Sequence, residues 1–181
     1  VEADTTRGTL AAMDPADWPT LAGIDESSPG ALSATVPVGP LLHALSTCWH
    51  AISTDATRYD LNGVFLEVIP DAPGARTGKL RTVATDGHRL AAVDTGIPFP
   101  CAGFGIIVPR KTVDLWIRAM KAKGAPATAR LVATTRRCAF VLGTVSMTSK
   151  VIDGTFPDYR RVIPHPTSVK RTLAVGRSAL A

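Results

Sequence analysis

The order of the hydrophobic patterns constrains the fold of this chain more than any other feature of its sequence. Two stretches, about 40–53 and about 110–122, have apolar residues at the three- and four-residue spacing of an amphipathic helix. Strand-type segments surround both, so the order is strand, helix and several strands, repeated once. No sequence identity links the halves. The repeated order predicts an α+β fold of two similar units, related by a pseudo-twofold axis, with helices covering one side of antiparallel sheets.

The first predicted helix has Pro40 in its first turn, a position that suits proline. Its apolar stripe consists of Leu41, Leu45, Cys48, Trp49 and Ile52. Between Gly39 and Arg58 it has no lysine or arginine, only His43 and His50. If this helix faces an anionic partner, it adds little attraction at neutral pH.

The second predicted helix follows Pro109, and Gly124 is placed to end it. Its apolar stripe consists of Val113, Trp116, Ile117 and Met120. At about 100° per residue, its basic residues fall together on the opposite side: Arg110, Lys111, Arg118 and Lys121. A helix with one apolar and one basic face can lie on a sheet and face an anion.

The remaining regular segments have strand-type patterns with turn residues between them. They are predicted at 64–69, 79–84, 89–94, 104–108, 129–133, 138–142 and 145–150. Hairpin turns are expected at Thr134–Arg137 and at Gly143. The domain that these segments form is predicted to span 31–165.

Two breaks in periodicity set those domain boundaries. Residues 13–30 hold three prolines, two glycines and several acids, a composition typical of a linker. Pro164–Ser168 is the second break. Residues 1–30 are therefore expected to be the end of a preceding domain plus a linker, and 166–181 a linker and the start of another domain.

Composition excludes several classes of protein. Hydrophobic residues make up 45% of the chain, which predicts a packed core. The apolar runs are strand-sized, far shorter than the roughly 20 residues that cross a bilayer. Cys48, Cys101 and Cys138 fit neither a disulfide framework nor a metal site, so reduced cysteines in or near the core are expected. A net charge of +5 is compatible with a nucleic acid or another anionic partner.

Asp86-Gly87-His88 is the one segment that suggests an enzyme, because an aspartate can orient a histidine as a general base. The usual hydrolase, metal-site and phosphate-loop motifs are absent from the sequence, and its carboxylates have no metal-binding spacing. A tight turn is the simpler interpretation, with Gly87 supplying backbone freedom and Asp86 bonding nearby amides. A small hydrolase using Asp86 and His88 remains an alternative.

Three segments combine arginine with apolar residues: 58–63, 85–90 and 156–162. Leucine and proline walls can bury an apolar anchor while guanidinium groups hold polar atoms at the rim. This composition suits a groove for a short peptide.

Four motifs in the same order resemble the bacterial sliding clamp, the beta subunit of the replicative DNA polymerase. They are Arg-Tyr-x-Leu-Asn-Gly at 58–63, Val-Ala-Thr-Asp-Gly-His-Arg-Leu at 83–90, Val-Pro-Arg-Lys at 108–111 and Ser-Lys-x-Ile-Asp-Gly-x-Phe-Pro-Asp-Tyr-Arg-Arg-Val-Ile-Pro at 149–164. The resemblance covers the middle of that family's three domains. It implies the DNA-clamp fold, with two βαβββ units and two helices packed on antiparallel sheets.

The resemblance also implies a function. Members of the family form a head-to-tail dimeric ring around duplex DNA and act as processivity factors, which are not enzymes and need no cofactor or metal. Polymerase, clamp loader and repair proteins insert a short linear motif into a pocket between the middle and third domains. The expected location is the cytoplasm, at the nucleoid. As the ring contacts lie in the other domains, a monomer or a non-native dimer is expected for this chain.

By motif position, the resemblance places the partner-peptide site on Arg58, Leu61, Thr85, Gly87, His88, Arg89, Leu90, Pro157, Arg161 and Val162. The DNA-facing residues would be Arg110, Lys111, Arg118 and Lys121. Asp60 stands where the family often has an aromatic residue, so no DNA contact is assigned to it. The third-domain wall of the pocket is not in this chain. A standalone truncated homologue that competes with the intact clamp is a further alternative.

Overall fold

The computed structural model describes residues 2–3, 6–7, 12, 14, 17, 23–100, 103–164, 168, 171, 174–176 and 178. Its helices are α1 (Val38–Cys48) and α2 (Arg110–Lys121), with short 3-10 turns η2 (Trp49–Ala51), η3 (Tyr59–Leu61) and η4 (Tyr159–Val162). Two short strands, β1 (Glu2–Ala3) and β2 (Thr6–Arg7), pair with each other. The expected linker and flanking segments lie largely outside the described residues.

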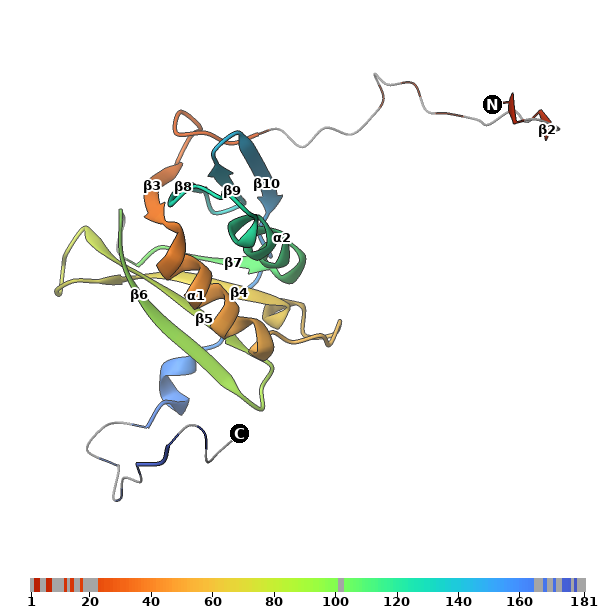
Figure 1. The fold of residues 1–181 in the computed structure, drawn as a ribbon. Helices are drawn as coiled ribbons and strands as arrows, with labels where there is room; N and C mark the ends of the chain where they lie inside the picture. Colours follow the sequence, from red (N-terminus) through yellow and green to blue (C-terminus); the bar gives the residue numbers. More distant parts are fainter. Residues whose placement is uncertain are drawn as a thin grey trace.

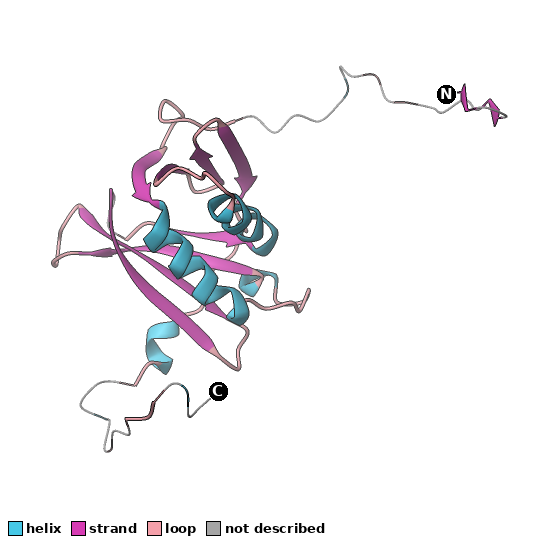
Figure 2. Ribbon diagram, viewed as in Figure 1, coloured by secondary structure: helices cyan, strands magenta, loops and turns pink. Residues whose placement is uncertain are grey.

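Two four-stranded antiparallel sheets form the body of the molecule (Figures 1 and 2). We call them sheet B and sheet C. Sheet B has the order β10 (Val145–Lys150), β9 (Arg137–Leu142), β8 (Thr128–Ala133) and β3 (Leu32–Pro37). Sheet C has the order β6 (Leu90–Pro100), β5 (Thr77–Thr85), β4 (Gly63–Pro70) and β7 (Gly105–Pro109).

The chain passes twice through strand, helix and three strands, so the predicted βαβββ order and α+β class are confirmed. The first strand of each unit joins the other unit's sheet. Strand β3 pairs with β8, and β7 pairs with β4. This reciprocal exchange ties the two units into one domain.

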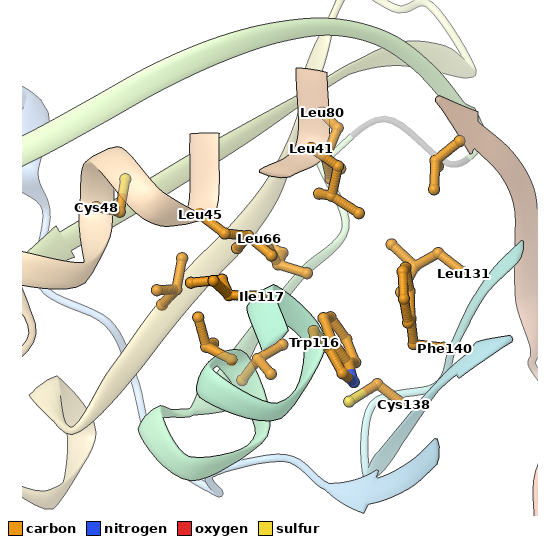
Figure 3. Close-up of a cluster of buried hydrophobic side chains, with 14 of the residues drawn as sticks. Leu41, Leu45, Cys48, Leu66, Leu80, Trp116, Ile117, Leu131, Cys138 and Phe140 are labelled. Carbon is orange, nitrogen blue, oxygen red and sulfur yellow. The ribbon is translucent and has the colours of Figure 1, made fainter. Parts of the chain in front are cut away.

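Both helices pack against the sheets through their apolar stripes, and the core lies between them (Figure 3). Leu41 and Leu45 of α1 meet Leu66 of β4 in this cluster, while Trp116 of α2 stacks on Phe140 of β9 at 5.1 Å between ring centroids. Because Trp116 and Phe140 are fully buried, truncating either to alanine should cost about 3–5 kcal/mol of stability.

Alternation along the strands separates the inner from the outer face of sheet C. Along β4, Val64 and Leu66 are buried in the helix-covered core, whereas Phe65 and Glu67 point to the other face and are partly exposed. The outer face of sheet C therefore carries apolar surface, such as Phe65, that the two helices do not cover. A segment described below covers it.

The predicted elements match the structure with shifts of one or two residues at several ends and three larger differences. The strand before α1 had been assigned no residues, and it is Leu32–Pro37. The helix predicted at 40–53 begins two residues earlier and ends at Cys48, where the chain tightens into η2. The strand predicted at 89–94 continues to Pro100, with an irregular register where it passes Lys79 and Arg81 of β5.

Cys48 and Cys138 are buried thiols, as predicted, while Cys101 lies outside the described residues. Burial raises the pKa of Cys138 to about 12, so this thiol stays protonated at neutral pH. Among the described residues, no helix is long and apolar enough to cross a membrane.

Candidate functional site

The turn between β5 and β6 is held by side chains of its own first residues. The Thr85 hydroxyl accepts a hydrogen bond from the Gly87 amide at 3.1 Å and donates one to the Arg89 carbonyl at 2.7 Å. Asp86 Oδ1 accepts from the amides of His88 and Arg89 at 2.9 and 3.0 Å. Gly87 has φ +91°, a conformation that side chains disfavour.

The amide hydrogen bonds from His88 and Arg89 lower the pKa of Asp86 to about 2, helped by the Arg89 guanidinium. Arg89 Nε donates to Asp86 Oδ2 at 2.9 Å, so both carboxylate oxygens are bound within the turn. The Asp86-Gly87-His88 segment, which suggested a hydrolase, therefore has a structural explanation. The Asp86 carboxylate binds the backbone and Arg89 side chain of its own turn. In the described segments, no three His, Cys, Asp or Glu side chains gather at a metal-binding spacing.

The segment after β10 crosses the outer face of sheet C, opposite α1. In Figure 1 it is drawn in blue and passes behind the sheet, in front of which α1 lies. Ile152 pairs with Ile107 of β7, and the Phe156 ring stacks on Phe65 of β4 at 4.9 Å. Tyr159 packs edge-on against Phe156 at 6.4 Å. We call residues 151–163 the C-terminal cover.

A second hydrophobic cluster lies under this cover. Its buried members are Leu61, Val83, Ile107, Phe156 and Tyr159. The partly buried Leu90 packs against it from the start of β6. This cluster brings the turn after β5, the η3 turn and the cover together, although they are far apart in sequence.

A groove of about 500 Å³ lies where these three segments meet. Its lining contains Leu61, Thr85, Gly87, His88, Arg89, Leu90, Pro157, Asp158, Tyr159 and Val162. All of the predicted peptide-site residues are among them except Arg58 and Arg161. Val162 is 69% exposed, so its apolar surface is open to a bound side chain.

Arg58 and Arg161 lie beside the groove and do not line it. Arg58 Nη1 donates to the Asp86 carbonyl at 3.3 Å. Its side chain lines a neighbouring cavity of about 350 Å³, which shares His88 and Arg89 with the groove. Arg161 extends from η4 into solvent, with a side chain that is 84% exposed and bonded to Asp158 at 2.9 Å.

Sequence reasoning did not identify Asp158 and Tyr159 as lining residues. The 156–162 segment had been recognised as one side of the groove, so their neighbourhood was visible in the sequence. The inward position of Tyr159 follows from its edge-on packing against Phe156, which a linear pattern does not reveal.

Helix α2 places its predicted basic residues on one side, but an acid stands among them. Lys111, Arg118 and Lys121 are exposed. Arg110 lies over the Trp49 ring at 4.8 Å. Asp114 pairs with Arg118 at 2.8 Å and reduces the net charge of this face. The spacing of four residues was a signal for this pair in the sequence.

A family model described as "DNA polymerase III beta subunit, central domain" matches residues 35–158. The beta sliding clamp of Caulobacter vibrioides is 38% identical over 174 residues, 96% of this chain and 44% of that protein. The beta sliding clamp of Escherichia coli K12 is 31% identical over 164 residues, 91% of this chain and 41% of that protein.

Solved structures agree with these sequence matches. The structure of Caulobacter crescentus pol III beta has a TM-score of 0.70 at 39% identity, over 84% of this chain and 39% of that one. A DnaN sliding clamp from Bartonella birtlesii bound to griselimycin has a TM-score of 0.70 at 35% identity, with the same coverage. The chain therefore spans less than half the length of the relatives that it matches.

Proposed function

The chain belongs to the bacterial beta sliding clamp family, and on that premise we propose that it is the peptide-binding central part of a DNA-encircling processivity factor. In this role it holds polymerase, clamp loader and repair proteins through short linear motifs. It acts in the cytoplasm, at the nucleoid, as part of a dimeric ring around duplex DNA. It is an accessory subunit and has no catalytic step of its own.

The observation that carries this proposal is the groove between the turn after β5 and the C-terminal cover. Leu61, Leu90, Pro157 and Val162 give it apolar walls, and Arg89 stands at its rim. Apolar pockets flanked by an arginine are typical of sites that anchor a few side chains of a peptide. The exposed Val162 supports this, because a bound apolar side chain would cover it.

Tethering explains why such a protein needs no active site. A polymerase that holds the ring through a linear motif stays near its template, because the second encounter with DNA becomes intramolecular. The ring itself then needs only loose contact with phosphates, which is independent of sequence and weakens with salt. The basic residues of α2 suit that contact.

A fluorescein-labelled clamp-binding peptide tests the groove. Arg89→Ala and Leu90→Ala are expected to weaken binding about tenfold each, because Leu90 supplies apolar surface and Arg89 a charged donor. Arg130→Ala is the matched control, since Arg130 is an exposed arginine of sheet B paired with Glu26. Griselimycin, which is bound to the Bartonella birtlesii relative, should compete with the peptide.

Binding that is unchanged by both groove substitutions would rule out this site. Equal losses for Arg130→Ala and Arg89→Ala would point to general electrostatic attraction instead of a groove. Turnover of an ester or phosphoester that His88→Ala abolishes would favour the hydrolase.

A further inference from the structure

The groove depends on a segment that has little internal structure of its own. η4 is a single 3-10 turn of four residues, and its backbone bonds from Arg161 to Asp158 and from Ile163 to Arg160 are long, at 3.4 and 3.3 Å. Pro157 and Val162, which face the groove, are exposed. The position of this wall must therefore be set by other contacts.

The apolar contacts of the C-terminal cover hold it to the sheet without fixing where it lies. The Phe65 and Phe156 rings are almost parallel, with an interplanar angle of 7°. Hydrophobic burial is non-directional, so it holds the cover against the sheet more firmly than it fixes the position of the cover along the sheet. A directional contact is needed to define the distance between the cover and the turn after β5.

A row of alternating charges on the outer face of sheet C supplies directional contacts. Glu67 of β4 faces Arg81 of β5, and Arg81 faces Asp94 of β6, in adjacent register positions. Arg81 donates to both oxygens of Asp94, at 2.6 and 2.9 Å. This two-bond pairing fixes the orientation of the Arg81 guanidinium.

Tyr159 joins this row from the cover. Its hydroxyl donates to Glu67 Oε2 at 2.7 Å and accepts from Arg81 Nη1 at 3.3 Å. Arg160, the next residue, pairs with the other oxygen of Glu67 and lies over the Tyr159 ring at 5.0 Å. Two consecutive residues of η4 are thus bonded to one carboxylate on the sheet.

Burial makes these bonds stronger than ordinary surface pairs. Tyr159 is 3% exposed, and the Glu67 side chain is 12% exposed. A carboxylate in that environment is costly to leave unpaired, whereas an exposed ion pair contributes little. The contacts of Glu67 therefore restrict η4 in a way that the exposed Arg161–Asp158 pair cannot.

We propose that Glu67, Arg81 and the Tyr159 hydroxyl are positioning residues that fix η4 on sheet C and so set the width of the peptide groove. This inference rests on the proposed peptide-binding function. Glu67 and Arg81 do not line the groove. They affect peptide binding indirectly, because they set the positions of Pro157 and Val162.

The test compares peptide binding by the 181-residue chain and its variants, measured by NMR titration so that weak binding is detected. Tyr159→Phe keeps the ring and removes only the hydroxyl. Glu67→Ala removes the acceptor, whereas Glu67→Gln keeps an acceptor oxygen. Glu26→Gln is the matched control, because Glu26 makes an exposed pair with Arg130 on the other sheet.

We expect Tyr159→Phe and Glu67→Ala each to weaken the peptide on the order of tenfold, with Glu67→Gln between Glu67→Ala and the unchanged chain. The Tyr159→Phe/Glu67→Ala double variant should bind no more than about twofold weaker than Glu67→Ala alone, because both remove the same contact. Amide exchange of residues 158–163 should accelerate in all three single variants and not in Glu26→Gln.

A purely structural role predicts a different pattern. If the variants lower the melting temperature but bind peptide like the unchanged chain, the positioning role is overturned while the groove stands. Multiplicative losses in the double variant also overturn it. If the unchanged chain does not bind the peptide, the proposed function fails and the positioning role fails with it.

Discussion

The two sheets of this domain have the same number of strands and the same kind of helix cover, but their outer faces differ in the described part of the chain. On sheet C, Phe65, Val83 and Ile107 lie under the C-terminal cover. On sheet B, the corresponding face has no aromatic ring among the described residues. Val132 and Ala139 are buried there, Val141 is half-buried, and Arg130 and Ser146 are exposed. The groove lies where the cover ends, so it belongs to sheet C alone.

This difference shows how a repeated architecture acquires a single binding site. The inner faces of both sheets contribute to one shared core. The outer face of sheet C uses aromatic residues to attach a segment that comes from the end of the other unit. A site can therefore arise on a near-symmetric scaffold by attaching a segment of the chain to the outer face of one sheet.

The helices differ in a similar way. α2 has Lys111, Arg118 and Lys121 on its surface, whereas α1 exposes His43 and no lysine or arginine. If both helices face DNA, the attraction to phosphate comes from α2.

Removing the main apolar contact of the C-terminal cover should produce the largest difference in stability between the two sheets. Phe156→Ala is expected to lower the free energy of unfolding by about 3 kcal/mol, because it removes a buried ring that stacks on Phe65. Val141→Ala, on the half-buried outer face of sheet B, should cost about 1 kcal/mol or less. Equilibrium urea unfolding measures both, and equal costs would contradict the distinction between the sheets.

Charge changes on α2 should alter DNA binding more than a change on α1 does. Lys111→Gln with Lys121→Gln should weaken binding of the chain to duplex DNA and reduce the salt dependence by about one phosphate contact per lysine. Asp114→Asn should strengthen binding, because it removes the acid that pairs with Arg118.

Fluorescence anisotropy at low salt measures both changes, with His43→Gln on α1 as the control. Loss of DNA binding in His43→Gln equal to that of the lysine variants would contradict the assignment to α2. Weaker DNA binding by Asp114→Asn would also contradict it, because removing an acid should strengthen binding to phosphates.

The hairpin turns of the two sheets should respond differently to pH. Asp86 has a folded-state pKa of about 2, below its usual 3.8, so its stabilisation of the turn is present above about pH 4. That stabilisation should be lost as pH falls through 2, and Asp86→Asn should remove the pH dependence. The β8–β9 turn is held by the Thr134 hydroxyl, which accepts from the amides of Arg136 and Arg137 and does not titrate in this range.

NMR titration of the side-chain carboxyls and turn amides between pH 5 and 2 separates the two turns. The amide signals of His88 and Arg89 should shift as the Asp86 carboxyl becomes protonated. This is the smallest of the expected effects. A matching shift at Arg136 and Arg137 would indicate general unfolding instead.

Much of the fold could be predicted from local pattern. Pro109 marked the start of α2 correctly, Pro40 lies in the first turn of α1, and the stripe through Trp116 identified the buried face of α2. The Thr85–Leu90 turn was recognised because Asp and Gly have strong turn preferences. Strand β6 was predicted too short, since Gly96, Pro98 and Pro100 are unusual in a strand, although Ile97 and Phe99 between them are buried.

The candidate site was only partly predictable, for a physical reason. The bond between Tyr159 and Glu67 joins residues 92 positions apart, and no periodicity connects them. Arg58 was placed in the groove because it shares a motif with Leu61, but it lies on the other side of the turn formed by Asp86 and Gly87. The motifs identified the segments that form the groove, whereas tertiary packing determines which of their side chains line it.

The proposed function requires that the outer face of sheet C binds a peptide. The most direct measurement is an amide NMR titration of the chain with a clamp-binding peptide. We predict shifts at residues 85–90 and 158–162, where the groove lies, and none along β8, β9 and β10. Shifts confined to sheet B or α2, or none at all with millimolar peptide, would contradict the account.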